Sequence, residues 1–280
     1  MISAHLMGGL GNQLFQIFAT IAYALRYNRP FVFEQRKSTA NDRQKMYWDN
    51  ILYFIRKNTT PNRIQWSIYR ESGYLYKPIS LVKCPMKLYG YFQSYKYFID
   101  QYKTIIKILQ LRKKQNAVKE RNEKYFQENN VNISLHFRIG DYVLPQFRDT
   151  HPLMPIVYYK KAIIKIIEKT KIDKLNIIYF CEKKDNERVE NIYIAVLQRK
   201  FPNITFVKAS DELDDWEQML LMSCCDHHII ANSSFSWWGA YFNASREKIV
   251  CYPSVWFNPK VKNHDTRYLC PDSWHKIGFV

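Results

Sequence analysis

Hydrophobic and polar positions follow two different periods along this chain, and the pattern is much more regular in its second half. A short apolar run at residues 2–7 leads into a glycine-rich segment, after which apolar residues recur at helical spacing from Leu14 to Leu25. This order predicts a strand, a turn and a helix, the opening of an α/β unit. Residues 34–80 have little periodicity, and we interpret them as helices and loops. Residues 101–128 are expected to form a basic amphipathic helix.

Beyond residue 130, apolar strands and amphipathic helices alternate. The apolar runs predict strands at residues 131–137, 175–180, 204–207, 227–231 and 248–252. Helical spacing predicts helices at residues 155–170, 185–200, 211–224 and 235–243. Such alternation is typical of a doubly wound, mostly parallel sheet. We therefore expect an α/β fold with two Rossmann-like halves, residues 1–128 and 129–280, facing across a cleft.

The composition is that of a folded protein with a basic surface. Of the 280 residues 47% are hydrophobic, and the formal net charge is +17. This charge favours nucleic acid, an anionic membrane face or a phosphate-bearing small ligand as partner, although many lysines merely solvate a surface. No apolar stretch reaches the roughly 18 residues needed to span a bilayer. We expect a cytoplasmic protein, with peripheral attachment to an anionic membrane left open.

The cysteines do not form a recognisable disulfide or metal framework. The six cysteines include no Cys-x-x-Cys pair, which indicates small core residues in a reducing compartment. The run Cys224-Cys225-Asp226-His227-His228 contains metal-binding residue types, but adjacent side chains cannot all point at one ion. A structural role is favoured for this run, and no metal site is expected.

Three segments place unusual residues where predicted strands end, which is where ligands bind in parallel α/β sheets. The first is the run Gly8 to Gln13, which is neither a Gly-x-Gly-x-x-Gly motif nor a Walker loop. Glycines before a helix let a ligand approach backbone amides at the helix N-terminus. The alternative is a tight turn that only packs the helix. The candidate ligand-binding residues are Gly9, Gly11, Asn12 and Gln13.

The second segment runs from His136 to Tyr142, directly after an apolar strand. Strand alternation sends His136 and Arg138 to one side and Phe137 to the other. An arginine offers a planar, permanently charged fork that suits a diphosphate, and it can stabilise charge on a departing β-phosphate. The alternative is a structural ion pair between Arg138 and Asp141.

The third segment is Asn232-Ser233-Ser234-Phe235-Ser236, followed by Trp237-Trp238-Gly239-Ala240. Ser233 or Ser234 is a natural N-cap, and hydroxyls with helix-end amides form a phosphate cradle. The two tryptophans are expected to pack in the core. The chain contains no Asp-x-Asp pair that could present a divalent metal to a diphosphate. Arg138 and helix amides would then carry that charge, which favours a two-domain, metal-independent transferase.

Together these segments resemble the alpha-1,2-fucosyltransferases of glycosyltransferase family eleven. The matching blocks are the Gly-Gly-Leu-Gly-Asn-Gln-Leu-Phe-Gln run at 8–16, His-x-Arg-x-Gly-Asp-Tyr at 136–142 and Asn-Ser-x-Phe-Ser-Trp-Trp-Gly-Ala at 232–240. Lesser blocks lie at 90–98 and 151–159. The resemblance implies a GT-B fold, a GDP-fucose donor, inversion at the anomeric carbon, no cofactor and a glycan acceptor. It also implies that Arg138 holds the diphosphate, with His136 beside it and Ser234 and Ser236 near the phosphates.

Two positions depart from the family pattern. Ile139 replaces the second of two adjacent arginines, which suits a position that packs. Phe180-Cys181-Glu182 replaces Phe-Ser-Asp, whose acid is expected to hold the nucleoside. Glu182 can reach a base or ribose from one carbon further away, or the donor differs. The general base is not identified, and the candidates are Asp141, His5 and acids of the N-terminal half.

Three other functions stay open at this point. One is a transferase with another deoxysugar donor, such as a rhamnose nucleotide. Another is a nucleic-acid-binding protein that uses the basic charge and the aromatic residues, although no recognised binding signature occurs. The third is an inactive homologue that binds glycans, which the presence of Arg138 and Asp141 disfavours.

Overall fold

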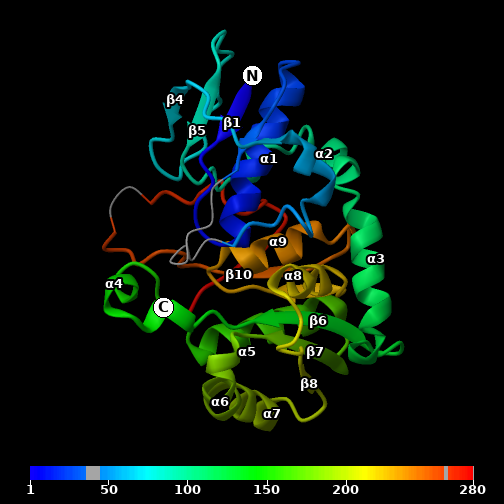
Figure 1. Cartoon of the computed structure of the whole chain (residues 1–280). Coiled ribbons are helices and arrows are strands. Elements are labelled where there is room, and N and C mark those ends of the chain that lie inside the picture. Colours follow the sequence, from blue (N-terminus) through cyan, green and yellow to red (C-terminus); the bar gives the residue numbers. More distant parts are fainter. Residues whose placement is uncertain (36–44, 262–263, 280) are drawn as a thin grey trace. The chain divides into compact units, whose positions relative to one another are not determined.

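The computed structural model describes residues 1–35, 45–261 and 264–279, and the chain folds into two compact α/β units (Figure 1). Unit 1 comprises Met1–Lys114 and Asn263–Pro271, and unit 2 comprises Gln115–Lys262 and Asp272–Val280. The sequence placed a single division at residue 128. The structure divides the chain fourteen residues earlier and returns a late segment to unit 1.

Side-chain hydrogen bonds explain why residues 115–128 belong to unit 2. The division falls inside helix α3 (Leu111–Arg121). The side-chain amide of Gln115 donates to Ser223 Oγ at 2.6 Å, and the carbonyl oxygen of Tyr125 accepts from Asn176 Nδ2 at 2.7 Å. Hydrogen bonds between residues so far apart in the chain do not affect the hydrophobic periodicity, so the sequence did not predict this boundary.

The late segment is held in unit 1 in the same way. Ser94 Oγ donates to the carbonyl oxygen of Tyr268 at 2.6 Å. The ammonium of Lys96 lies 3.4 Å from the centre of the Tyr268 ring, a cation–π contact.

Unit 1 contains a small parallel sheet beside a long buried helix. Its strands, in the order β1-β5-β4, are β1 (Ile2–Ala4), β5 (Met86–Tyr89) and β4 (Ser67–Arg70). A second parallel pair joins β2 (Phe33–Glu34) to β3 (Thr59–Thr60). The helical segments are α1 (Leu10–Arg26), η1 (Tyr53–Asn58), η2 (Tyr95–Tyr97) and α2 (Tyr102–Ile108).

Two predictions for this unit are wrong. Within 34–80, the described residues include the end of β2 and the strands β3 and β4, besides the expected loops and the 3₁₀ helix η1, and β4 is a mostly exposed edge strand without an apolar run. The helix expected over residues 101–128 is broken, because Gln110 adopts a positive φ of 47° between α2 and α3. The last turn of that stretch is the separate 3₁₀ helix η3 (Glu123–Tyr125).

Unit 2 is built on six parallel strands in the order β11-β10-β9-β6-β7-β8. The strands are β6 (Val131–His136), β7 (Leu175–Phe180), β8 (Thr205–Lys208), β9 (His227–Ile229), β10 (Val250–Pro253) and β11 (His275–Ile277). The helical segments are η4 (Gly140–Val143), α4 (Pro145–Arg148), α5 (Ile156–Thr170), η5 (Lys183–Asp185), α6 (Asn186–Arg188), the π-helical turn η6 (Val189–Ile194), α7 (Ala195–Lys200), α8 (Asp215–Ser223) and α9 (Ser234–Phe242). The five predicted strands of this half are confirmed, and β11 was not expected.

The strand order creates a topological switch point between β6 and β9. The chain starts at β6, adds β7 and β8 on one side, and then returns to the other side of β6 to add β9, β10 and β11. In open parallel sheets a crevice forms at the carboxyl ends of the two strands where the order reverses, and ligands bind there. The second and third sequence segments follow these two strands.

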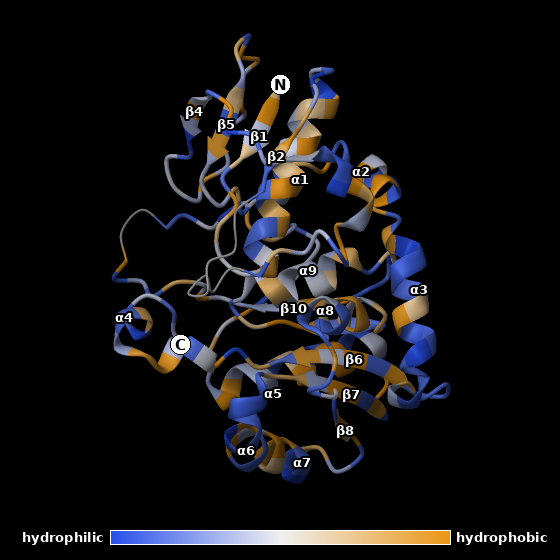
Figure 2. Ribbon diagram, viewed as in Figure 1, coloured by the Kyte–Doolittle hydropathy of each residue, from blue (hydrophilic) through white to orange (hydrophobic). Residues whose placement is uncertain are grey.

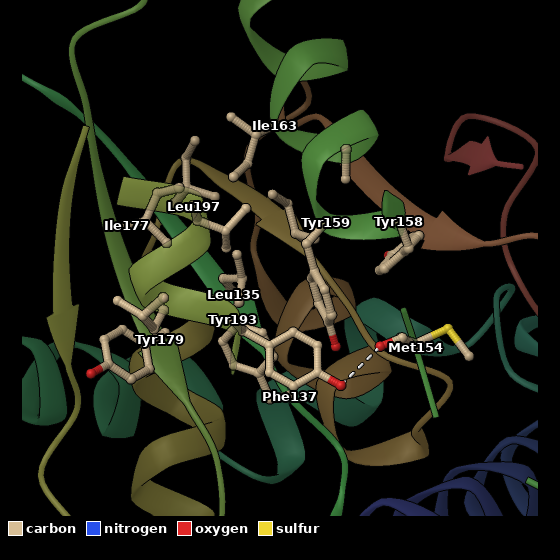
Figure 3. Close-up of a cluster of buried hydrophobic side chains, with 14 of the residues drawn as sticks. Leu135, Phe137, Met154, Tyr158, Tyr159, Ile163, Ile177, Tyr179, Tyr193 and Leu197 are labelled. Atoms are coloured by element: carbon tan, nitrogen blue, oxygen red, sulfur yellow. Dashed lines mark hydrogen bonds between the residues drawn. The ribbon is translucent and has the colours of Figure 1, made fainter. Parts of the chain in front are cut away.

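The sheet of unit 2 is covered on both faces, as its apolar strands predict (Figure 2). Ile133, Leu135 and Phe137 pack with α5, η6 and α7 in one hydrophobic core, part of which Figure 3 shows. Ser134 points to the opposite face, where its hydroxyl bonds Nδ1 of the buried His228 at 2.7 Å. Alternation in β6 therefore separates a wholly apolar face from one with buried polar pairs.

The structure also tests several smaller predictions about tryptophan, histidine and cysteine residues. Trp237 and Trp238 are fully buried, so the core-packing prediction is confirmed. His228 bonds Ser134 and Asn243, which gives the Cys224–His228 run a structural role. Cys84 is exposed, and for that cysteine the core prediction is wrong. No helix in the described ranges is long and apolar enough to cross a membrane.

Candidate functional site

The segments after β6 and β9 are joined at the switch point. The hydroxyl of Tyr142, in η4, donates to the carbonyl oxygen of Asn232 at 3.1 Å. Burial raises the pKa of Tyr142 to about 12, so this hydroxyl keeps its proton throughout the physiological range. The second and third sequence segments therefore lie side by side, as the predicted parallel sheet requires.

Arg138 is the central charged group of this site. Its two terminal nitrogens bond the carboxylates of Asp141 and Glu182, and its guanidinium lies 4.9 Å from the centre of the Tyr142 ring. The expected ion pair with Asp141 is present, and Glu182 from the end of β7 adds a second one. About a quarter of the Arg138 side chain is exposed, so the fork remains accessible to a ligand.

The charge on Arg138 is stable against deprotonation. Burial by itself lowers the pKa of the guanidinium, whereas Tyr142 and the carboxylates of Asp141 and Glu182 raise it, and the net shift is upward. The two carboxylates also fix the plane of the fork. A diphosphate bound here would compete with them for the same N–H groups.

Gly140 allows this arrangement. Its φ is +41°, a left-handed conformation that favours glycine, and a Cβ atom there would collide with the Glu182 carboxylate and lie 3.0 Å from Arg138 Nη1. Its amide donates to Oδ2 of the buried Asp185 at 2.8 Å. Asp185 was not singled out in the sequence, because acidic residues are common in the first turn of helices.

His136, the last residue of β6, is buried beside Arg138. Burial, with a contribution from the positive charge of Arg138, lowers the pKa of His136 to about 3, so the imidazole is neutral near pH 7. Its ring centre lies 5.5 Å from that of Phe235, at the start of α9, and its Nδ1 is buried with no hydrogen-bond partner. A buried polar atom without a partner is costly, which marks this atom as a ligand contact candidate.

The strand alternation predicted for this segment is confirmed. Phe137 and Ile139 are buried in the core of α5, η6 and α7, whereas His136 and Arg138 are not part of it. The ring centres of Phe137 and Tyr159 lie 4.6 Å apart, and both side chains are drawn in Figure 3. Ile139 therefore occupies a packing position, as the sequence suggested for this departure from the family pattern.

The N-terminus of α9 faces the same edge of the sheet. Ser233 is the N-cap, and its hydroxyl accepts from the amide of Phe235 at 3.3 Å. Ser236 is buried and donates to the carbonyl oxygen of Ser233 at 3.4 Å. Two of the predicted phosphate-binding hydroxyls thus already serve the helix end, and Ser234 and Phe235 are the half-buried members of the set.

Asn232 anchors the loop that leads into α9. Its side-chain amide donates to the carbonyl oxygens of Pro152 and Trp256, at 2.9 and 3.1 Å. Its Oδ1 is buried without a hydrogen-bond partner, like Nδ1 of His136. The carboxyl ends of β6 and β9 therefore each present one unpaired buried polar atom.

In unit 1, the first sequence segment lies at the carboxyl end of β1. Helix α1 begins at Leu10, so Gly11, Asn12 and Gln13 lie in its first turn, and the expectation that Gly11 precedes the helix is wrong. Gly9 is the exposed N-cap residue, and a Cβ there would meet nothing within 4 Å. This space is what a ligand approaching the backbone requires.

The side chains of this turn hold the local structure. Gln13 Nε2 donates to the carbonyl oxygens of Gly8 and Lys45, at 2.9 and 3.0 Å. Asn12 Oδ1 accepts from Nε2 of Gln93 at 2.8 Å, which joins the first turn of α1 to the loop after β5. Gln93 belongs to one of the lesser family blocks, and its spacing from Asn12 gave no sign of this contact.

Comparison with known protein families agrees with the blocks identified in the sequence. Residues 6–275 match the family described as Glycosyl transferase family 11. An alpha-1,2-colitosyltransferase from Escherichia coli is 27% identical over 99% of both chains. The O-antigen biosynthesis glycosyltransferase WbnK from Escherichia coli is 36% identical over 54% of this chain, and the match spans 46% of that protein.

Two solved structures align with this chain at low sequence identity and low TM-score. The ADP-heptose lps heptosyltransferase II of E. coli aligns over 59% of this chain and 43% of its own with a TM-score of 0.38 and 14% identity. A glycosyl transferase family 9 protein from Veillonella parvula covers 99% of this chain and 84% of its own with a TM-score of 0.48 and 11% identity.

Proposed function

The chain belongs to glycosyl transferase family 11 and is a glycosyltransferase, and we propose that it moves L-fucose from GDP-fucose to a sugar hydroxyl of a glycan in α-1,2 linkage. In this proposal the chain has the GT-B arrangement, with unit 2 binding the nucleotide sugar and unit 1 binding the acceptor. Family membership favours this enzyme over the nucleic-acid-binding protein considered from the charge.

The observation that carries the proposal is the position of Arg138 at the switch point of unit 2. The guanidinium follows β6, is held by two carboxylates, and is adjacent to the neutral imidazole of His136, whose Nδ1 has no hydrogen-bond partner. The N-terminus of α9, a favourable place for phosphate, follows β9 at the same edge. This combination supports binding of a diphosphate without a metal ion.

The proposed reaction is a single displacement with inversion. The acceptor oxygen forms a bond to the anomeric carbon while the bond from that carbon to the β-phosphate oxygen breaks, and the nucleoside diphosphate leaves with the electron pair. Arg138 stabilises the charge that develops on the leaving phosphate, and its preorganised fork makes this stabilisation stronger in the transition state than in the ground state.

Glu182 is proposed to contact the nucleoside. It follows β7, the second strand of unit 2 along the chain and the neighbour of β6, the position from which an acid bonds the ribose in dinucleotide-binding sheets. The carboxylate is two-fifths exposed and also pairs with Lys184 at 3.0 Å, so it can turn from Arg138 towards a hydroxyl.

A second candidate donor is another deoxyhexose nucleotide. The relative that aligns along its whole length is named for colitose, itself a deoxysugar, which favours a donor without the 6-hydroxyl group over an ordinary hexose nucleotide. The proposed glycan acceptor agrees with the O-antigen role in the name of the other relative, whereas the proposed peripheral membrane contact rests on the basic charge of this chain.

A thermal-shift panel tests the donor class. GDP, UDP, GDP-fucose and a rhamnose nucleotide are each added to the purified chain, and we expect GDP and GDP-fucose to raise the melting temperature while UDP does not. Transfer of radiolabelled fucose to a galactoside then tests the reaction. If no nucleotide stabilises the chain, the proposal fails. If a different deoxysugar nucleotide is the best substrate, the second candidate replaces the first.

A further inference from the structure

Glu71 lies directly after β4, at the carboxyl edge of the unit 1 sheet. The two other strands of that sheet end in family blocks at the same edge, β1 in the Gly8 turn and β5 in the run from Gly90 to Ser94. Because the three strands are parallel, their carboxyl ends meet on one side. Glu71 is the acidic side chain that the fold adds to this edge.

The contacts of Glu71 hold one carboxylate oxygen firmly and leave the other nearly unbound. Oε2 accepts from the backbone amides of Tyr91 and Phe92, at 2.8 and 2.7 Å. Oε1 receives a long hydrogen bond of 3.4 Å from the Tyr97 hydroxyl. A carboxylate oxygen can accept more than one hydrogen bond, so Oε1 has capacity to accept one from a substrate hydroxyl.

Gly90 is shaped for this carboxylate. Its φ is +157°, and a Cβ atom there would collide with the side chain of Glu71. Gly140 has the same relationship to Glu182 in unit 2. At both sheet edges a glycine lets an acidic side chain lie flat against the backbone, so the first residue of the 90–94 block serves to position Glu71.

We propose that Glu71 is the general base of the transfer reaction and takes the proton of the acceptor hydroxyl at Oε1. This inference rests on the proposed function. As the acceptor oxygen bonds to the anomeric carbon, its proton moves to the Glu71 carboxylate, and the nucleoside diphosphate departs with the electrons of the broken bond. The products are the new glycoside, the diphosphate and a protonated Glu71, which releases its proton to solvent.

The electrostatic surroundings of Glu71 suit this role. Burial raises the pKa of Glu71 to about 7, while the bonds from the Phe92 and Tyr91 amides and from Tyr97 pull it down. A base with a pKa near the working pH combines a useful deprotonated fraction with the strongest driving force for proton transfer. Among the described residues, the titratable groups that interact with it are Tyr69, from β4, and Tyr97, from η2, and both have raised pKa values.

The other base candidates are less suitable. One oxygen of Asp141 is bonded to Arg138, so this carboxylate neutralises and orients the guanidinium. His5 lies between strand β1 and the glycine turn, and its ring is stacked on Tyr89 with centres 5.0 Å apart. Glu71 combines a half-buried side chain, a raised pKa and an oxygen with spare capacity.

The decisive variant is Glu71→Gln. Glutamine keeps an oxygen that accepts the two backbone amides and an amide nitrogen opposite Tyr97, so the fold is retained, but it takes no proton. We expect kcat to fall by about 10²- to 10³-fold, with the affinity for GDP, measured by calorimetry, and the melting temperature unchanged. Glu168→Gln, the same change at an exposed glutamate of α5, is the control and leaves kcat unchanged.

Tyr97→Phe supplies a readout that a purely structural role would not give. Removing the Tyr97 hydroxyl removes a bond that lowers the pKa of Glu71, so the acid limb of the kcat–pH profile moves to higher pH. A Glu71→Gln enzyme that transfers at more than a third of the wild-type kcat overturns the assignment, as does an unmoved acid limb in Tyr97→Phe. If the wild-type chain itself transfers no sugar, the proposed function has failed instead.

Discussion

The hydroxyl of Tyr142 and the carbonyl oxygen of Asn232 are joined by a hydrogen bond of 3.1 Å, although 90 residues separate them in the chain. This bond ties the loop after β6, which carries Arg138, to the loop after β9, which begins α9. The same tyrosine ring lies against the Arg138 guanidinium. One side chain therefore contacts the Arg138 guanidinium and also joins its loop to the loop that begins α9.

Replacing Tyr142 by phenylalanine should loosen this tie while preserving the ring. We expect a loss of about 1 kcal/mol in the free energy of unfolding, the usual value of one such hydrogen bond, and a rise of a few fold in the donor KM with little change in kcat. Urea unfolding and steady-state kinetics measure both. Unchanged stability together with an unchanged KM would show that the bond positions nothing.

Arg138→Lys should reduce kcat by roughly 10²- to 10³-fold, because a lysine keeps the charge but loses the planar fork that bonds two partners at once. Arg267→Lys is a matched control, since Arg267 is an exposed arginine that also pairs with a carboxylate, that of Asp265. The measurement is the sugar-transfer rate of both variants. A near wild-type rate for Arg138→Lys removes Arg138 from the proposed role.

Gly140→Ala should damage the site through sterics alone. The new Cβ meets the Glu182 carboxylate in a backbone conformation that alanine rarely adopts, so we expect a loss of about 1–3 kcal/mol in stability and weaker GDP binding. Gly278→Ala is the control, because a Cβ there has nothing within 4 Å. Chemical denaturation and calorimetry distinguish them, and equal effects of the two substitutions contradict the steric account.

Acid should destabilise the fold through His136. The unfolded chain takes up this proton below about pH 6.5, whereas the folded chain resists it down to about pH 3, since burial lowers the pKa. Between these values the unfolded state binds more protons, so stability falls as pH falls, by at most about 1.4 kcal/mol per pH unit for this residue.

The variant His136→Gln isolates that contribution. Buried His228 acts in the same direction, and Glu71, with its raised pKa, acts in the opposite direction between about pH 4.5 and 7, so the wild-type slope alone is a sum. We expect urea unfolding of His136→Gln to vary less steeply between pH 6 and 4 than that of the wild type. Identical slopes would mean that His136 is protonated in the folded state.

The sequence predicted the core of unit 2 well, since strands of a parallel sheet are buried on both faces and appear as apolar runs such as 175–180. It also predicted that Phe137 and Ile139 pack while His136 and Arg138 do not. It missed β4, because an exposed edge strand has no such run, and it joined α2 to α3, because nothing in the local pattern marks the turn at Gln110.

The sequence likewise predicted only part of the charged network around Arg138. The motif of residues 136–142 indicated Arg138 and its pairing with Asp141, which lie three residues apart. The second partner, Glu182, comes from another strand, and its contact with the guanidinium was not foreseen. Glu71 was not singled out, because a single acid in a segment with little periodicity has no distinguishing spacing.

By itself the sequence determined the α/β class, the apolar strands of unit 2 and the segments that carry the chemistry, because periodicity and short motifs are local properties of the chain. Only the tertiary structure decided which strand ends are neighbours, where the two units divide, and which acids lie beside Arg138 and at the edge of the unit 1 sheet. Those outcomes depend on hydrogen bonds and packing between residues far apart in the chain, such as Tyr142 and Asn232, and no local pattern encodes such partners.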